Sequence, residues 1–560
     1  MKTKFYFGLL AAAALSMTAC SSENEPNNSP DNGSVQDGER YVAVSIRNVG
    51  GIGSRAEVYE EGVGNESQIT KDNIRFYFFT ADGRPFVMNQ NGVNGSVSET
   101  NMVAPQEIAS EETDGGAIET LKAKLVLGTP TEAYKGNRPA YVFCVANPTS
   151  SFAFTNFANK RVSEIYNIFG NAPTTLNADN TFVMTSSTYG DASITNNPLQ
   201  TGSKVVFFTD LEGKIFDNPD DAIDNPADIY LERLAAKVRV KGLGTYLIKE
   251  KQEDGTLVDA TFAIKTLVNG AITTTTGNKL DVELTGWKLR NTAKTAYGIK
   301  HINNDWMTNA PFAGWNITDL HRSFWGTSHV ASANDIENIS YDIYNASQFA
   351  LKNYDDSSDD NKKLNIAYCY ENNMVQPSSI SDRPTDATAI VVRGVVKMNG
   401  SDEGLALCYW GGDYYTEEAL KEQFIQTYNA DKNEGDKLTR DAVHFAKYTQ
   451  QGAKSNTWYA YVQVGENQVH NNYRFANIKR WNNEDGTSVG TTSYYVNIAH
   501  MGGLYGVIRN HIYDYTFENV VGLGVPGNDP KNPDPETDTY LAARVYVLNW
   551  HVVSNNVVLE

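Results

Sequence analysis

Hydrophobic and polar residues alternate in many short runs along the chain, and the first clear run lies at residues 41–47. Val42, Val44 and Ile46 share one side of this run, and the residues between them share the other. Successive side chains of a β-strand point to opposite faces, so this alternation is typical of a strand with one buried face. The pattern therefore predicts a strand whose two valines and isoleucine lie in a core.

Similar runs recur to the end of the chain and predict further strands. Residues 140–146, AYVFCVA, are almost continuously apolar, which is typical of a central strand buried on both faces. Asn269-Gly270 lies between two such runs and is a strong hairpin signal. Other predicted strands span residues 74–79, 122–127, 234–240, 280–287, 389–397, 458–464, 494–498 and 512–517.

Helical patterns are few. Residues 416–428 give the clearest one, because Leu420, Phe424 and Tyr428 recur at the spacing of one helix face. Thr416 is expected to cap the N-terminus, and the two glutamates after it suit the positive end of the helix dipole. Weaker patterns predict short helices at residues 163–169 and 439–448.

Many strands joined by turns, with few helices, predict an all-β fold of two tandem β-sandwich domains. The predicted divisions are 1–20 (export signal), 21–55 (acidic tether and first strand), 56–245 (N-terminal domain), 246–525 (C-terminal domain with an irregular insert at 292–384) and 526–560 (proline-rich linker and closing strand).

The first residues have the pattern of an export signal. Lys2 and Lys4 flank the start of an apolar run at residues 5–15 that is too short to span a bilayer. The run is followed by Met17-Thr18-Ala19-Cys20, which resembles a bacterial lipobox, so Cys20 is predicted to carry the lipid. Several acyl chains on one cysteine give stable anchoring to a membrane. The alternative is an ordinary cleaved signal with a coincidental cysteine.

The predicted first strand is followed by a segment that a protease can reach. Residues 50–54, GGIGS, contain three glycines that leave the backbone flexible. Arg55 and Ala56 come next and form the predicted cleavage site. We hypothesise that the strand at residues 41–47 is a placeholder, removed by cleavage so that another molecule's strand takes its groove. The alternative is a permanent first strand beside an incidental arginine.

Charge and cysteine content narrow the range of functions. A formal net charge of −20 argues against nucleic-acid binding, because a nucleic acid is itself strongly negative. Besides Cys20, the chain has the dispersed cysteines Cys144, Cys369 and Cys408. They are interpreted as buried free thiols, since their spacing fits no zinc site.

The sequence contains no recognisable catalytic constellation. Its eight histidines are dispersed, and neither HExxH nor GxSxG occurs. His500 and His511 flank a glycine-rich turn without a nearby nucleophile, so structural roles are expected. Acidic clusters at 217–224 and 355–360 are interpreted as solvated loops, with calcium binding as the alternative. The aromatic residues at 409–415 are expected to pack in a core, with sugar binding as the alternative. Enzyme activity, a cofactor and a metal are therefore not predicted.

Three segments share motifs with a known family. Residues 507–513, VIRNHIY, match an "RN-x-IY" strand entry, and residues 545–552, VYVLNWHV, match a closing "V-x-V-L-x-W-x-V" strand after a Pro- and Asp-rich linker. Residues 232–238, ERLAAKV, match an "ER-x-x-A-(K/R)" strand. With the lipobox and the cut site, these segments resemble the Mfa-type fimbrillins, the shaft subunits of type V pili in anaerobic Gram-negative bacteria.

The resemblance implies transthyretin-like Greek-key sandwiches and a structural role in a fimbrial shaft that supports adhesion and biofilm formation. It implies an outer-membrane lipoprotein precursor, with acyl chains such as palmitate on Cys20, that an Arg-specific protease cuts after Arg55. A C-terminal strand of another subunit then fills the groove and builds a head-to-tail filament at the cell surface, with anchor and tip subunits as further partners. The candidate donor residues are Val545, Val547, Trp550, Val552, Val557 and Leu559.

Two other functions stay open at this point. One is a monomeric cell-surface lipoprotein whose β-sandwich domains bind a glycan or a host protein. The other is a tip or anchor subunit of the same pilus. The cut site at Arg55 favours a shaft subunit over an anchor, which should keep its lipid, and the closing strand disfavours a tip, which need not donate onward.

Overall fold

The structure, a computed structural model, describes residues 40–48, 69–91, 96–111, 120–170, 182–186, 209–301, 328, 336–337, 366–372, 387–447, 458–465, 469–482, 489–500, 504–527, 540–549 and 552–554. These residues form mostly β-strands in several sheets, with few short helices, which confirms the predicted all-β fold. No helix in this part of the chain is long and apolar enough to cross a membrane.

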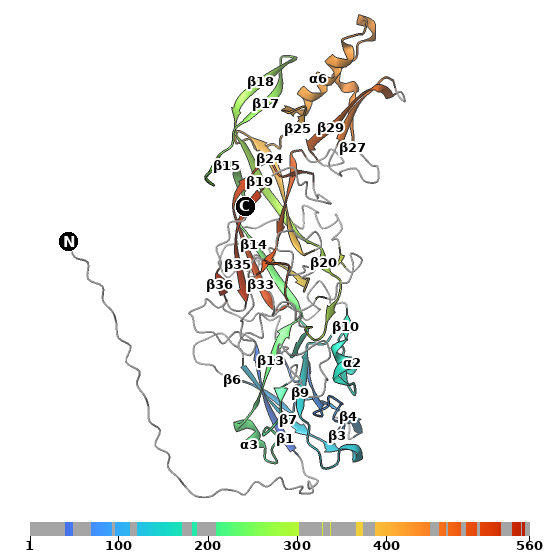
Figure 1. Cartoon of the computed structure of the whole chain (residues 1–560), viewed down its shortest axis with the longest axis vertical. Coiled ribbons are helices and arrows are strands. Elements are labelled where there is room, and N and C mark those ends of the chain that lie inside the picture. Colours follow the sequence, from blue (N-terminus) through green and yellow to red (C-terminus); the bar gives the residue numbers. More distant parts are fainter. Residues whose placement is uncertain are drawn as a thin grey trace, which may run out of the picture. The chain divides into compact units, whose positions relative to one another are not determined.

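The N-terminal strands form a nine-stranded sheet (Figure 1). Its strands are β1 (Arg40–Asn48), β2 (Ile74–Phe79), β5 (Met102–Val103), β6 (Glu107–Glu111), β7 (Thr120–Leu127), β9 (Tyr141–Ala146), β11 (Met184–Ser186), β12 (Thr209–Asp210) and β13 (Ala227–Arg233). They lie in the order β5-β2-β9-β11-β13-β1-β7-β6, and β12 also pairs with β9. As predicted, β9 is central and almost entirely buried.

Both faces of this sheet are covered where β2 and β9 lie. Phe76 and Phe78 belong to one buried cluster, and Tyr77 and Phe79 belong to another on the opposite face. The second cluster includes residues of the short helices α1 (Phe154–Phe157) and α2 (Val162–Tyr166). A strand buried on both faces has no need of polar alternation, which explains its continuous apolar sequence.

Small elements border this sheet. A three-stranded sheet contains β3 (Met88–Asn91), β4 (Val97–Thr100) and β8 (Thr129–Pro130), and a 3₁₀ turn, η2, spans Glu132–Tyr134. The helix predicted at 163–169 is shorter than expected, because β10 (Phe169–Gly170) pairs with β21 (Ala296–Tyr297).

An eleven-stranded sheet begins directly after β13. Its strands are β14 (Ala235–Lys241), β15 (Thr245–Lys251), β16 (Leu257–Asp259), β19 (Leu280–Arg290), β23 (Ile366–Tyr370), β24 (Ala389–Met398), β30 (Thr491–Asn497), β33 (His511–Val521), β34 (Val525–Pro526), β35 (Tyr540–Asn549) and β36 (Val552–Ser554). Two-stranded pairs are formed by β20 (Thr292–Ala293) with β22 (Ile336–Glu337), and by β31 (Ala499–His500) with β32 (Leu504–Tyr505).

A seven-stranded sheet carries its own core. Its strands are β17 (Phe262–Val268), β18 (Ala271–Asn278), β25 (Leu407–Trp410), β26 (Asp413–Thr416), β27 (Val443–Lys447), β28 (Trp458–Gln463) and β29 (Val469–Trp481). Asn269 and Gly270 join β17 to β18 with φ values of 50° and 79°. Positive φ at both central residues is what a tight hairpin turn requires, and the predicted hairpin is confirmed.

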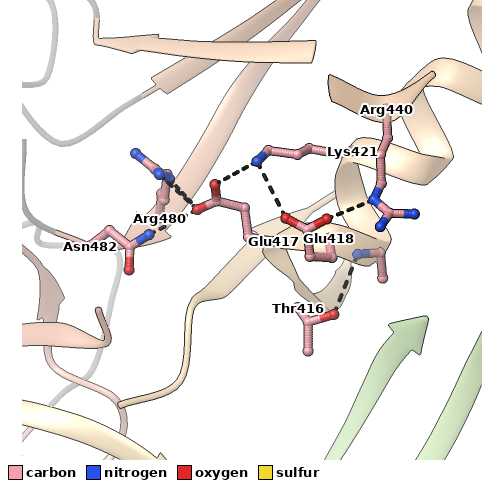
Figure 2. Close-up of polar contacts among 8 residues, drawn as sticks. Thr416, Glu417, Glu418, Lys421, Arg440, Arg480 and Asn482 are labelled. Carbon is pink, nitrogen blue, oxygen red and sulfur yellow. Dashed lines mark hydrogen bonds and ion pairs between the residues drawn. The ribbon is translucent and has the colours of Figure 1, made fainter. Parts of the chain in front are cut away.

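The predicted helix at 416–428 is confirmed as α6 (Glu417–Asn429), with Leu420, Phe424 and Tyr428 buried. The Thr416 hydroxyl accepts the Ala419 N–H at 3.4 Å, as expected of a cap. Glu417 and Glu418 at the start of the helix bind cations from other elements (Figure 2). Arg480 of β29 donates to the Glu417 carboxylate at 2.7 Å, which fixes α6 on the sheet. Arg440 reaches Glu418 from a following 3₁₀ turn at 2.8 Å.

The helix predicted at 439–448 is wrong. This segment forms a 3₁₀ turn, η7 (Arg440–Ala442), and then strand β27, and another 3₁₀ turn, η6 (Glu434–Asp436), precedes it. β27 pairs antiparallel with β28 along its whole length. Long-range pairing with a partner strand therefore outweighs the local helical pattern, as is common for short segments.

The sheets change within two residues. Arg233 ends β13 in the first sheet, and Ala235 begins β14 in the second. The predicted boundary at residues 245 and 246 thus falls at the start of β15, inside the second sheet. The division into domains at 56–245 and 246–525 stays a prediction.

Candidate functional site

Strand β1, the predicted removable strand, lies inside the first sheet and not at its edge (Figure 1). It pairs antiparallel with β7, from Arg40 opposite Leu127 to Arg47 opposite Thr120. It pairs parallel with β13, from Val44 opposite Ala227 onward. Removal of β1 would therefore leave two facing strands without their common neighbour.

The side chains of β1 contribute to the core of this sheet. Val42 and Val44 are 0% exposed and belong to the cluster that contains Leu125 of β7. Ile46 is paired in register with Leu121 and Ile229, both of which are buried in the same cluster. The groove that holds β1 is thus lined by apolar residues of both neighbouring strands.

The opposite face of β1 is covered as well. Ala43 points away from the valines and is fully buried. Helix α3 (Pro219–Asp224) contacts β1, and its Ala222 is buried. The Tyr41 N–H donates to the Phe216 carbonyl at 2.7 Å, and the Phe216 N–H donates back at 2.9 Å.

Helix α3 lies in the segment that the sequence presented as an acidic loop. Asn218 caps it by accepting the Asp220 N–H at 3.0 Å, and most of its acidic side chains are exposed. The acidic side chains at 217–224 are exposed, as predicted, but residues 219–224 form helix α3 and not the predicted loop. Among the described residues, no group of His, Cys, Asp or Glu is arranged to hold a metal ion. The second acidic cluster, at 355–360, lies outside the described residues.

Several predicted site residues also lie outside the part of the chain that the structure describes. They are Cys20, Arg55, Ala56, Trp550, Val557 and Leu559. Their roles stay predictions. Val545, Val547 and Val552 lie on strands β35 and β36.

Strand β35 pairs with the family-like strand β33 over its full length. The antiparallel register places Val547 opposite Tyr513 and Val545 opposite Tyr515. Both tyrosines are fully buried, and burial raises the pKa of each phenol above its usual range. β36 then pairs back on β35, with Val552 opposite Leu548. The positions of Val545 and Val547 thus belong to a strand that completes the chain's own second sheet.

The structure brings the two family-like motifs together at the change of sheets. Arg233, at the end of β13, donates from Nη1 to the Asn510 Oδ1 at 3.0 Å. The Asn510 N–H donates to the Ala235 carbonyl at 2.8 Å. Glu232 forms an ion pair with Lys300 at 2.8 Å, and both side chains are at most 2% exposed. Arg233 and Asn510 therefore connect β13 to the start of β33, whereas Glu232 is paired with Lys300.

Two more buried ion pairs flank this connection. Arg509 Nε lies 3.1 Å from Glu371 Oε2, with both side chains 1% exposed. Arg239 of β14 lies 2.7 Å from Asp514 of β33. His511 lies between Arg509 and Asp514 in the sequence and is buried. Burial lowers the pKa of its imidazole to about 4, so the ring is neutral at pH 7. The sequence showed both motifs but did not predict that they meet. The signal that could have indicated a contact was the presence of charged residues within segments expected to be buried strands.

The remaining candidates for chemistry are packing residues. Cys144, Cys369 and Cys408 are buried free thiols, as predicted, and burial raises the pKa of Cys369 to about 12. Such thiols are poorly ionised and therefore unreactive. Trp410 packs edge-on against Phe424 at 4.9 Å between ring centroids, which confirms core packing for the aromatic residues at 409–415.

Comparison with protein families identifies the last part of the chain. Residues 489–556 match the family described as the major fimbrial subunit protein (type IV), fimbrillin, C-terminal. The C-terminal part of the chain is fimbrillin-like. The fimbrillin match covers β30 and the whole β33–β36 region, and it indicates a fimbrial subunit at the cell surface.

No curated protein sequence matches the chain. Among solved structures, the chain is similar to a candidate cell adhesion protein from Parabacteroides distasonis, with 11% identity, coverage of 92% of this chain and 98% of that one, and a TM-score of 0.35. It is also similar to the C-terminally truncated tip fimbrial protein Mfa3 from Porphyromonas gingivalis, with 12% identity, coverage of 91% and 99%, and a TM-score of 0.28.

Proposed function

We propose that this chain is a structural subunit of a fimbrial shaft that polymerises by exchange of its first strand. The observation that supports this most is the position of β1 between β7 and β13, with Val42 and Val44 fully buried. In this proposal the chain is exported as an outer-membrane lipoprotein precursor anchored through Cys20, and an Arg-specific protease cuts it between Arg55 and Ala56.

The energetics of β1 give the proposal its driving force. A fully buried valine contributes about 1.5–3 kcal/mol relative to an exposed one. Loss of β1 would expose the apolar groove around Leu125 and leave β7 and β13 with unpaired backbone groups. A strand of another subunit restores these contacts, and because donor and groove lie at different places on the chain, the filament grows open-ended.

The tail offers two donor segments, and the pairing of β35 favours the second. Val545 and Val547 would have to leave β33, where their positions face buried tyrosines. Val557 and Leu559 follow β36 in the sequence and lie outside the described residues. We therefore assign the inserted part to the residues after β35, with the linker at 526–539 and β35 keeping the tail attached to its own sheet.

Limited proteolysis tests the proposal. Brief trypsin treatment of the chain should yield a product that begins at Ala56 and assembles into rods visible by electron microscopy. The matched control is Arg55→Ala, which should stay uncut there and form no rods. Rods from the Arg55→Ala variant, or cleaved protein that never assembles, would contradict strand exchange and favour a monomeric surface protein that binds a glycan or host protein.

Two truncations locate the donor. A chain that ends at Asn549 keeps β35 but lacks Trp550, Val552, Val557 and Leu559, and we expect it to be cut yet unable to extend a filament. A chain that ends at Asn556 lacks Val557 and Leu559 but keeps Trp550 and Val552, and it should polymerise weakly because two apolar donor side chains are lost. Full polymerisation of the chain that ends at Asn549 would place the donor at Val545 and Val547.

A further inference from the structure

The β17–β18 hairpin places an uncharged strand at the edge of the seven-stranded sheet (Figure 1). β18 has the sequence AITTTTGN and, within the described part of the chain, lies at the end of the strand order with β17 as its neighbour. Of its eight residues, Ile272 is half-buried, Asn278 is buried and the other six are exposed. Isoleucine and threonine favour extended backbone, so the strand is well suited to pair again.

Proteins usually protect such an edge, because its free N–H and C=O groups can pair with another strand. The usual devices are a lysine, a proline or a bulge in the middle of the edge. β18 has no charged residue and no proline. Its register shifts only at the far end, where the residues from Phe262 to Ile264 of β17 face those from Asn278 to Thr275 of β18, and Gly277 has a φ of 76°. Among the residues that the structure describes, residues 271–275 therefore form a regular edge with no second strand paired to it.

The charges beside the hairpin are neutralised within the molecule. Lys265 of β17 lies 2.6 Å from Asp413 on the neighbouring strand β26. Lys279, which follows β18, lies 2.9 Å from Asp259. The edge strand β18 is thus uncharged, and the lysines beside it are paired with aspartates, on a chain whose formal net charge is −20.

The absence of charge on β18 points to a second copy of this chain as its partner. A contact about a two-fold axis places each residue against its own patch, so every uncompensated charge meets its own sign. β18 carries no charged residue and so avoids that penalty, on a chain whose formal net charge is −20. Cross-strand pairs of threonine and other β-branched residues are favourable, and like charges directly opposite are not.

We propose that β18 of one molecule pairs antiparallel with β18 of a second molecule, centred on Thr273. This register places Ala271 opposite Thr275 and Ile272 opposite Thr274 of the other copy. The contact uses neither the groove of β1 nor the C-terminal tail, so it forms in the uncleaved chain and would join filaments side by side once they exist.

Sedimentation velocity of the Arg55→Ala chain over a concentration series tests this pairing, because that background excludes polymerisation by strand exchange. We expect a monomer–dimer equilibrium. Thr273→Lys should weaken the dimer at least tenfold, since the two lysines would meet at the axis. Ala263→Lys is the matched control, because it adds the same charge at an exposed site on the inner strand β17 and should leave dimerisation unchanged.

A mixing experiment makes the assignment specific to Thr273. Thr273→Lys alone and Thr273→Asp alone should both be monomeric, and an equal mixture should dimerise, because opposite charges then meet at the axis. Three results would overturn the proposal: the Arg55→Ala chain is a monomer throughout the series, Thr273→Lys and Ala263→Lys dimerise equally well, or the mixture stays monomeric. Each of these leaves the trypsin test of strand exchange unaffected.

Discussion

Shortening Val44 to alanine should destabilise the precursor but leave the filament unchanged. Val44 is fully buried in β1, and the substitution removes two methyl groups worth about 0.8 kcal/mol each, plus a small cavity term. The expected loss is about 2 kcal/mol of local stability in the uncleaved chain. In the proposed filament the residue has left with β1, so the same substitution should have no effect.

Hydrogen–deuterium exchange at the amides of β7 measures this difference, because β7 pairs with β1 along most of its length. A loss of about 2 kcal/mol corresponds to roughly thirtyfold faster exchange, since about 1.4 kcal/mol is tenfold. The control is Leu125→Ala, which removes a core side chain of β7 itself and should accelerate exchange in precursor and filament alike. If Val44→Ala filaments exchange as fast as Leu125→Ala filaments, β1 stays in the polymer and strand exchange is refuted.

Three further predictions concern stability. Arg509→Met should cost about 3–5 kcal/mol in urea unfolding by leaving the Glu371 carboxylate buried without its cation, and the double variant with Glu371→Leu should recover most of that loss. Because the pKa of His511 is lowered to about 4, the unfolded chain binds more protons than the folded chain between about pH 4 and 6.5. The contribution of His511 to stability is therefore full above that range and falls by about 3 kcal/mol as pH drops through it. His511→Gln should remove this pH dependence from the midpoints of urea unfolding. Thr416→Ala should lower the stability of the α6 region by about 1 kcal/mol or less, measured by exchange of the first-turn amides, since its capping bond is long.

The features that the sequence predicted well are those decided by neighbouring residues. The hairpin at Asn269-Gly270, the central strand β9 and helix α6 each depend on turn chemistry, apolar continuity or a helix face within one segment. The strand at 41–47 was predicted for the same reason, but its position between β7 and β13 in the sheet depends on residues far along the chain. The helix predicted at 439–448 was wrong because β27 pairs with β28, and the local sequence pattern does not indicate such a contact with a later segment.

The meeting of Arg233 with Asn510 was beyond the sequence for the same physical reason, since 277 positions separate them. The motifs could be recognised in the sequence, but the residues that they contact could not. A buried arginine or glutamate needs a specific hydrogen-bonding or charged partner, and a single sequence gives no means of choosing among distant candidates.

The buried charges at the change of sheets are better explained by specificity than by strength. Replacing a buried ion pair with apolar residues is often neutral, whereas removing one partner is costly, so such pairs penalise wrong arrangements more than they stabilise the right one. Glu232 and Arg233 extend β13, the parallel neighbour of β1, and Asn510 leads into β33, the partner of β35. The Arg233–Asn510 hydrogen bond therefore joins the end of β13, which pairs with β1, to the start of β33, which pairs with β35. In the proposed filament a subunit presents a groove and a donor in constant relation to each other, and it therefore requires that kind of restraint more than it requires additional stability.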